Sequence, residues 1–243
     1  MPAIKVTLNE AFDLVNDILD AGLVANLLGS PGLGKSDIMR KVAKHRNKLL
    51  LDIRLTTMDP TEMNGFPFMF EVSDGNRRAS YVPMDTFPLE DWPLPEGMDG
   101  WHIFFDEANS CSKAVEAAAY KVVLDKMVGA YKLHPNVDMT MAGNLVTDNA
   151  IAGRAGTAMQ SRVVTLIVRA CLNGWQEWAI DSSIDERVRA FLNFRPALLH
   201  SFDPDKSQKE TNFPCPRTWE FTSKLCSVWG PEVPQGKLPA IAG

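Results

Sequence analysis

The sequence feature that most constrains this chain is a short stretch that fits a phosphate-binding loop. Residues 29–36 read Gly-Ser-Pro-Gly-Leu-Gly-Lys-Ser and match the pattern G-x-x-x-x-G-K-[ST] at every fixed position. An apolar run over residues 23–28 predicts a buried strand before it, and residues 37–46 predict a helix after it. Such a strand, turn and helix start form an anion site, because free backbone N–H groups and the helix dipole face the loop. The stretch therefore predicts nucleotide binding.

Each part of this loop has an expected task. The Lys35 ammonium is expected to reach the β- and γ-phosphates, and the Ser36 hydroxyl to coordinate Mg²⁺. ATP and Mg²⁺ are therefore the expected cofactors. The alternative is a glycine-rich turn with an exposed lysine, and the strand and helix on either side argue against it. The predicted nucleotide-binding residues are Gly29, Ser30, Pro31, Gly32, Leu33, Gly34, Lys35, Ser36 and Asp37.

Composition and charge narrow the class of protein. Of the 243 residues, 45% are hydrophobic and 23% charged, which is typical of a soluble globular protein. The net charge of −5 argues mildly against a nucleic-acid partner, although it leaves room for a local basic channel. No apolar stretch approaches the ~18 residues of a membrane span, and residues 1–10 lack the layout of a signal peptide. The cysteines are far apart in sequence, so we expect reduced thiols and a cytoplasmic protein.

Apolar runs that alternate with stretches of helical periodicity predict the fold class. Continuous apolar strands between helices are typical of a parallel sheet covered on both faces, as in the α/β P-loop NTPases. A first helix is expected over residues 6–20, and further helices over 112–128 and 150–160. The predicted sheet has five strands, at residues 23–28, 48–55, 101–105, 137–142 and 163–168.

A change in composition near residue 170 predicts a domain boundary. No further core-type strand follows it, and three helical stretches appear instead, at residues 175–180, 184–199 and 219–228. We expect a nucleotide-binding α/β domain over residues 1–170 and a small α-helical lid domain over residues 171–243.

A β-hairpin is expected near residues 66–83, inserted after a short helix at 61–65. Four prolines between residues 56 and 88 exclude a long helix, and Asp74-Gly75 is a hairpin turn signal. Two interpretations stay open. The hairpin is either a surface flap or a loop that contacts a substrate or a neighbouring subunit.

Two acidic residues end an apolar strand about 70 residues after the phosphate loop. Because ligands sit at the carboxyl ends of strands in open parallel sheets, Asp106 is expected to hold the Mg²⁺ that Ser36 also binds. Glu107 is then expected to polarise the attacking water as general base. The alternative is a pair of ordinary acids at a strand end that faces solvent.

Asn144 ends the next predicted strand. A neutral amide there can orient water or contact the γ-phosphate without adding negative charge, and strand ends on one sheet edge converge on one site. An asparagine in a strand-end turn is the alternative, since such turns favour this residue.

Three arginines are candidates for contact with the transferred phosphate. Arg162, between a helix and the last strand, is the predicted finger that acts on a neighbouring subunit, with Arg154 as its rival. Arg217, at the start of the last helix, is expected to reach back to the phosphates from the lid, because arginine favours bidentate phosphate contacts. Each could also be a surface arginine. The predicted catalytic residues are Lys35, Glu107, Asn144, Arg162 and Arg217.

Taken in chain order, these elements resemble an AAA+ ATPase over roughly residues 1–230. Within AAA+, the loop Gly-x-Pro-Gly-x-Gly-Lys-Ser, the run Asp-Glu-Ala-Asn and the inserted hairpin look most like the MoxR branch, which belongs to the clade with a hairpin inserted in helix 2. The resemblance assigns residues 29–36 to Walker A, 104–109 (Phe-Phe-Asp-Glu-Ala-Asn) to Walker B, 142–144 (Ala-Gly-Asn) to sensor 1, 160–162 (Gln-Ser-Arg) to the arginine finger and 216–217 (Pro-Arg) to sensor 2.

This resemblance implies a homo-oligomer, a hexameric ring with ATP at the subunit interfaces. It also implies a protein-remodelling or chaperone role, often beside a von Willebrand factor A-domain partner. Two departures from the MoxR pattern matter. MoxR proteins usually have an Asp-Arg-Phe finger motif, whereas Gln160-Ser161-Arg162 is nearer the Ser-Arg motif of clamp loaders. The sequence also stops at Gly243 without a clear final lid helix, which is expected of a short or truncated form.

Two other functions stay open at this point. The first is a nucleic-acid-linked AAA+ motor or loader, of clamp-loader or restriction-translocase type, for which Arg77, Arg78 and Lys132 are candidate contacts. The second is a nucleotide-dependent scaffold without hydrolysis, against which the presence of Glu107 and Asn144 argues.

Overall fold

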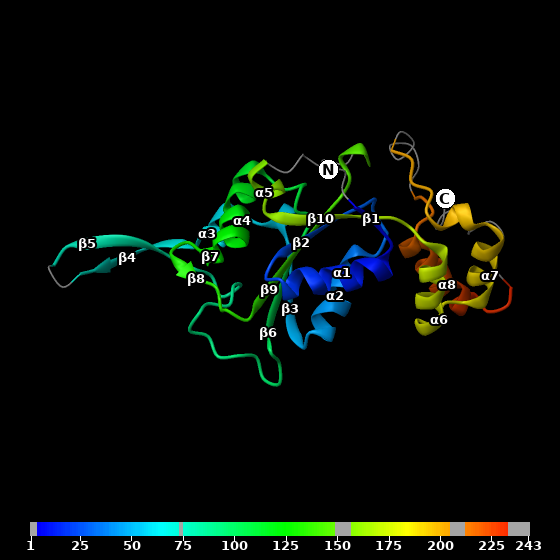
Figure 1. Ribbon diagram of the computed structural model, residues 1–243, viewed down its shortest axis with the longest axis horizontal. Helices are drawn as coiled ribbons and strands as arrows, with labels where there is room; N and C mark the ends of the chain where they lie inside the picture. The colour runs from blue at the N-terminus through cyan, green and yellow to red at the C-terminus, as the bar shows by residue number, and fades with distance from the viewer. Residues whose placement is uncertain (1–3, 73–74, 149–156, 205–211, 233–243) are drawn as a thin grey trace.

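A six-stranded parallel sheet forms the centre of the molecule (Figure 1). The computed structural model describes residues 4–72, 75–148, 157–204 and 212–232. The strand order β1-β10-β2-β9-β6-β3 and the parallel pairing of all neighbours confirm the predicted α/β fold class. The strands are β1 (Ile4–Val6), β2 (Val24–Leu28), β3 (Lys48–Arg54), β6 (Gly100–Asp106), β9 (Val137–Gly143) and β10 (Val163–Val168).

The sheet has one strand more than the five expected, and the addition is β1. Residues 4–6 pair with β10 at the sheet edge, and the expected helix starts two residues later than Val6, as α1 (Leu8–Asp20). Thr7 caps that helix, and its side chain and that of Glu10 each accept a hydrogen bond from the other's backbone N–H. This capping box is a sequence signature of a helix start. A three-residue edge strand has too short a pattern to be seen from sequence.

Helices cover both faces of the sheet, and the core has one half on each side. Alternate residues of a strand point to opposite faces, so Phe104 packs against α1 and α2 (Lys35–His45), while Ile103 and Phe105 pack against α4 (Lys113–Asp125). All three side chains are fully buried. Two short helices, α3 (Pro60–Asn64) and α5 (Thr157–Gln160), lie with α4 in Figure 1. Burial on both faces explains why β6 is an uninterrupted apolar run.

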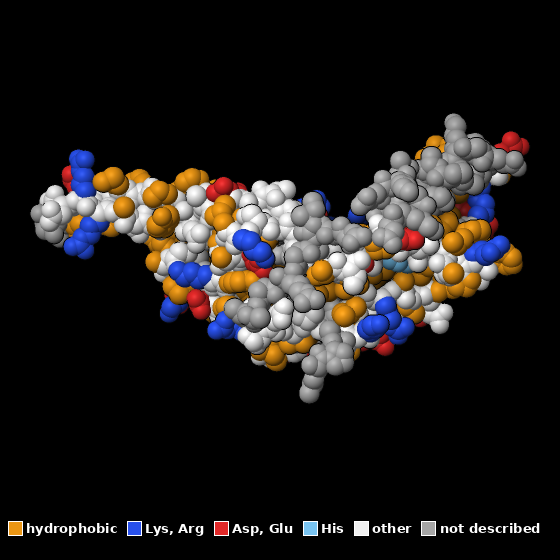
Figure 2. All heavy atoms as spheres, turned by 90° about the horizontal axis from the view of Figure 1, so that it is seen from above, with side chains coloured by type: hydrophobic (Ala, Val, Ile, Leu, Met, Phe, Trp, Pro, Cys, Tyr) orange, Lys and Arg blue, Asp and Glu red, His pale blue; other side chains and the backbone are white. Residues whose placement is uncertain are grey.

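The predicted hairpin is present and projects far from the sheet (Figure 1). Its strands β4 (Phe66–Glu71) and β5 (Arg77–Val82) pair only with each other among the described residues. Figure 2 shows hydrophobic side chains along this arm and basic ones toward its far end. Phe66, Phe68 and Phe70 alternate along β4, so they share one face, and all three are exposed.

The helix after β6 ends earlier than the expected residue 128. Lys126 has a left-handed backbone, with φ of 51°, which stops α4 at Asp125. A small hairpin follows, formed by β7 (Met127–Val128) and β8 (Tyr131–Lys132). Two 3₁₀ turns, Leu55–Thr57 and Val146–Asp148, follow strands β3 and β9.

Three helices form the C-terminal helical part, α6 (Leu172–Asp181), α7 (Glu186–Phe194) and α8 (Pro216–Trp229), and they lie at the end opposite to the hairpin (Figure 1). They enclose an apolar cluster of their own, which includes Trp175, Leu192 and Trp219. The prediction of one continuous helix over residues 184–199 is wrong, because α7 ends at Phe194 and the helical backbone breaks at Arg195. Pro196 disfavours helical backbone in the residue before it, and a 3₁₀ turn, Pro196–Leu199, follows.

His102 on β6 makes the stability of this core sensitive to acid. Its side chain is fully buried, and Nε2 lies 2.8 Å from Thr140 Oγ1. Burial lowers the pKa of His102 from 6.5 to about 4. Above pH 6.5 neither the folded nor the unfolded state binds this proton, and between 6.5 and 4 only the unfolded state does. As the pH is lowered from 6.5 to 4, the free energy of unfolding should therefore fall by about 1.4 kcal/mol for each pH unit.

Urea unfolding of the wild type and of His102→Gln between pH 7.5 and 4.5 measures this loss. The glutamine does not titrate, so we expect the wild type to lose about 2–3 kcal/mol more than the variant over that range. Parallel pH dependences of the two proteins would contradict the proposed cost of protonating His102.

All four cysteines are unpaired in the structure, as expected. Among the described residues, no helix combines the length and the apolar character that crossing a membrane requires.

Candidate nucleotide-binding site

The predicted site residues meet at the carboxyl edge of three neighbouring strands. The phosphate loop follows β2, Asn144 follows β9, and Asp106 ends β6. These strands are consecutive in the order β2-β9-β6, although β9 is the last of the three in sequence. Ligands of open parallel sheets sit outside these strand ends.

Lys35 is buried at the centre of the phosphate loop. Its Nζ donates to the carbonyls of Gly29 and Ser30, at 2.6 and 3.0 Å, and to Asn144 Oδ1 at 3.3 Å. Burial lowers the pKa of Lys35 to about 8, and the nearby carboxylates of Asp106 and Asp148 oppose that shift. The lysine and the amide of Asn144 thus lie in contact at the same edge of the sheet.

Ser36 and Asp106, the predicted Mg²⁺ ligands, bring two oxygen-bearing side chains together. The Ser36 hydroxyl donates to Asp106 Oδ2 at 2.9 Å. A hydroxyl and a carboxylate suit Mg²⁺, which binds oxygen ligands and keeps several waters and phosphate oxygens. The residues present therefore fit the predicted ion. When bound, Mg²⁺ neutralises charge on the phosphate oxygens.

Glu107 is held in an uncommon backbone conformation directly after Asp106. Its φ is 55°, in the left-handed region that a non-glycine residue seldom adopts. Its N–H donates to Asp106 Oδ1 at 2.9 Å, and its Oε2 accepts from the Thr56 hydroxyl. Such strain is typical of positions where the surrounding fold fixes a side chain for function.

Asn109 positions Asn144, a role that the sequence predictions did not assign to it. The Asn109 amide donates to the Asn144 carbonyl at 2.8 Å, and its Oδ1 accepts from the Asn144 N–H at 3.2 Å. Gly143 has no space for a side chain, because a Cβ there would lie 2.3 Å from Asn109 Oδ1. Asn109 is the last residue of the Phe-Phe-Asp-Glu-Ala-Asn run, so its position after the acidic pair was the available signal.

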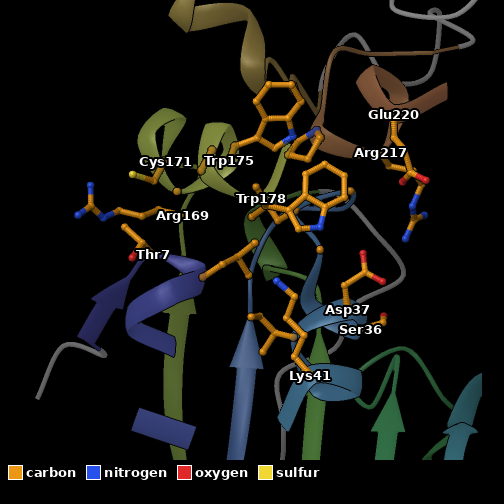
Figure 3. A pocket seen from close by; sticks show the side chains of 18 of the residues that line it. Thr7, Ser36, Asp37, Lys41, Arg169, Cys171, Trp175, Trp178, Arg217 and Glu220 are labelled. Atoms are coloured by element: carbon orange, nitrogen blue, oxygen red, sulfur yellow. The ribbon is translucent and has the colours of Figure 1, made fainter. Parts of the chain in front are cut away.

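A pocket of about 420 Å³ opens beside the loop, within the usual size of small-molecule sites. Ser36, Asp106, Glu107 and Arg217 line it. Figure 3 shows the side chains that face it from α2, from the start of α1 and from α6 and α8. A further part of its wall is formed by Thr7, Leu8, Arg169, Cys171, Trp175 and Trp178.

That wall was missed by the sequence analysis. Trp175 is 7% exposed, and its Nε1 has no hydrogen-bond partner within the described part of the chain. Trp178 lies one turn further along α6 and also lines the pocket. Two tryptophans spaced i, i+3 were visible in the sequence, but the spacing alone indicates only a shared helix face.

Asp148 was also missed. It is 8% exposed, lies in the 3₁₀ turn after β9, and its Oδ2 has no hydrogen-bond partner among the described residues. Its carboxylate helps to keep Lys35 charged. It lies four positions after Asn144, and nothing in that spacing predicts burial.

Comparison with solved structures identifies the fold. Two variants of RuvB from Thermotoga maritima superpose with a TM-score of 0.52, at 13–14% identity, and cover 96–97% of this chain and 67–71% of their own. RuvB is an AAA+ ATPase. The fold is that of the AAA+ ATPases. Identity this low shows the fold and nothing further.

Another solved structure is similar over a shorter range. A “putative ATPase” from Cytophaga hutchinsonii matches at 17% identity with a TM-score of 0.46, covering 69% of this chain. This chain spans about half of that protein, with 48% covered. No protein-family model matches the sequence, and no curated protein does.

The candidate arginines differ in their position relative to the pocket. Arg217, on the first turn of α8, lines the pocket, and its charge acts on Lys35. Arg162 is exposed, precedes β10 at its amino end, and is absent from the described residues that line the pocket. The structure thus brings Arg217 to the site of its own chain but does not bring Arg162 there. Arg154 lies outside the described residues.

Proposed function

We propose that this chain is an Mg²⁺-dependent ATPase that works as a ring of identical subunits. One observation carries this proposal: Lys35, the Ser36–Asp106 pair, Glu107 and Asn144 meet at one edge of the sheet, beside a pocket of nucleotide size. The groups in this arrangement match the steps of phosphoryl transfer. In the proposed reaction, Lys35 and the Ser36–Asp106 pair with its Mg²⁺ would contact the phosphates, and the Glu107 carboxylate would face the attacking water.

We further propose a protein-remodelling or chaperone role of MoxR type. Its support is the hairpin, which is inserted after the short helix α3 and exposes three phenylalanines. Exposed apolar side chains on a projecting arm are typical of surfaces that contact another protein. The proposal includes a hexameric ring, a von Willebrand factor A-domain partner and a cytoplasmic location. Residues 171–243 are proposed to act as the lid over the nucleotide.

A nucleic-acid-linked motor is the second candidate. The exposed aromatics and the basic pair Arg77 and Arg78 on the hairpin favour it, because bases stack on aromatic side chains beside a positive charge. However, Arg77 Nε lies 3.7 Å from Glu71 Oε1, and this carboxylate offsets part of the positive charge. The net charge of −5 also favours a protein substrate.

Steady-state ATP hydrolysis as a function of protein concentration tests the proposal. We expect Mg²⁺-dependent turnover whose rate per chain rises with concentration, because a shared site exists only in the assembled ring. Single-stranded or duplex DNA should leave the rate unchanged. DNA-stimulated turnover that fades as salt is raised would favour the nucleic-acid motor instead. Absence of both ATP binding and hydrolysis would contradict the ATPase itself.

A further inference from the structure

The helical part contacts the phosphate loop at the peptide unit between Pro31 and Gly32. His200, directly after the Pro196–Leu199 turn, places Nε2 3.2 Å from the Pro31 carbonyl oxygen. A carbonyl only accepts, so this hydrogen bond requires the tautomer in which Nε2 carries the proton. Burial lowers the pKa of His200, which keeps the imidazole neutral in that form. The charged groups near it are Asp148 and Lys35.

The other half of the same peptide packs on the residue before α8. Gly32 has φ of 78°, and a Cβ there would lie 2.4 Å from Cys215 Sγ. Cys215 is buried, and its N–H donates to Thr218 Oγ1 at 2.9 Å, which fixes it at the helix start. The loop backbone therefore rests directly on the helical part, and only glycine leaves room for that contact.

Peptide geometry turns these two contacts into a statement about phosphate binding. The chain has no cis peptide bond in its described part, so the Pro31 carbonyl and the Gly32 N–H point in opposite directions from one plane. A carbonyl held toward His200 turns the Gly32 N–H away from His200. No described residue accepts a hydrogen bond from that N–H. It stays available to an anion, as the loop's N–H groups are in phosphate sites.

We propose that His200 is a positioning residue: by holding the Pro31 carbonyl, with Cys215 packed on Gly32, it keeps the Gly32 N–H directed at the β-phosphate of the nucleotide. This inference rests on the proposed nucleotide-binding function and adds a coupling to it. When the helical part moves away, the hydrogen bond and the packing contact are lost together, and the peptide is free to rotate. The position of the helical part therefore sets the affinity for the β-phosphate.

Matched amide variants test this role without changing the polarity of the site. The N–H of glutamine reaches the position of Nε2 in histidine, whereas that of asparagine reaches only the position of Nδ1. We expect His200→Asn to weaken ADP binding about five- to tenfold, the worth of one hydrogen bond, and His200→Gln to restore most of it. AMP has no β-phosphate, so its affinity should change less than about twofold in both variants.

The measurement is titration calorimetry of the full chain with ADP and with AMP, in the presence of Mg²⁺. His45→Gln is the control, because His45 is exposed on α2. Unchanged ADP binding in His200→Asn would overturn the inference, and so would equal weakening of ADP and AMP or a failure of glutamine to rescue. A wild type that binds neither nucleotide would instead overturn the proposed function.

Discussion

Replacing Glu107 by glutamine should lower kcat for ATP hydrolysis by about 100- to 10,000-fold, the usual contribution of a general base. Glutamine keeps the size of the side chain and can still accept from the Thr56 hydroxyl, as Glu107 does. It cannot take a proton from water. Because Glu107 lies after Asp106, the proposed Mg²⁺ ligand, rather than on the loop, ATP binding should stay within a few-fold of the wild type.

Initial rates give kcat, and calorimetry gives the affinity for ATP. Glu96→Gln removes the same charge from an exposed position, and its rate should equal that of the wild type. If Glu107→Gln hydrolyses ATP at the native rate, Glu107 is not the base. If ATP binding is lost together with turnover, Glu107 is needed for nucleotide binding. Its assignment as general base is then not supported.

Replacing Arg162 by alanine should lower kcat by about 1,000-fold or more, the range known for arginine fingers. Arg162 is exposed and is not among the described residues that line its own pocket, so any contact with phosphate has to be made on a neighbouring subunit. A guanidinium that meets the charge developing on the transferred phosphate acts mainly in the transition state. The affinity for ATP should therefore change little compared with the rate.

Mixing the two inactive variants tests whether Arg162 acts on a neighbour. In a mixed ring, an Arg162→Ala subunit supplies an intact Glu107, and an adjacent Glu107→Gln subunit supplies an intact Arg162. Roughly a quarter of the interfaces are complete after random mixing in equal amounts, so a corresponding part of the wild-type rate should return. Arg195→Ala is the control, since Arg195 is also exposed. If the mixture shows no activity, and the wild-type rate per chain does not depend on protein concentration, Arg162 is a surface arginine without a catalytic role.

Much of the sheet and of the phosphate site was predictable because the information is local. The loop is one unbroken run of residues, and each core strand is an apolar run that only burial on both faces explains. The position of Asp106, Glu107 and Asn144 at strand ends then follows from the rule for parallel sheets. The sequence predictions were wrong where the hydrophobic pattern was short or ambiguous, as in the three-residue strand β1 and at the helix break before Pro196.

The sequence alone therefore determined the kind of fold, the phosphate loop and the strand-end residues beside it. Only the tertiary structure decided which residues surround the loop and which line the pocket beside it. Trp175, Asp148 and His200 look ordinary in sequence. In the structure Trp175 lines the pocket, Asp148 acts on Lys35, and His200 contacts Pro31 across 169 positions. No local pattern encodes such a contact, because it depends on how the helical part packs against the sheet rather than on the residues at either end.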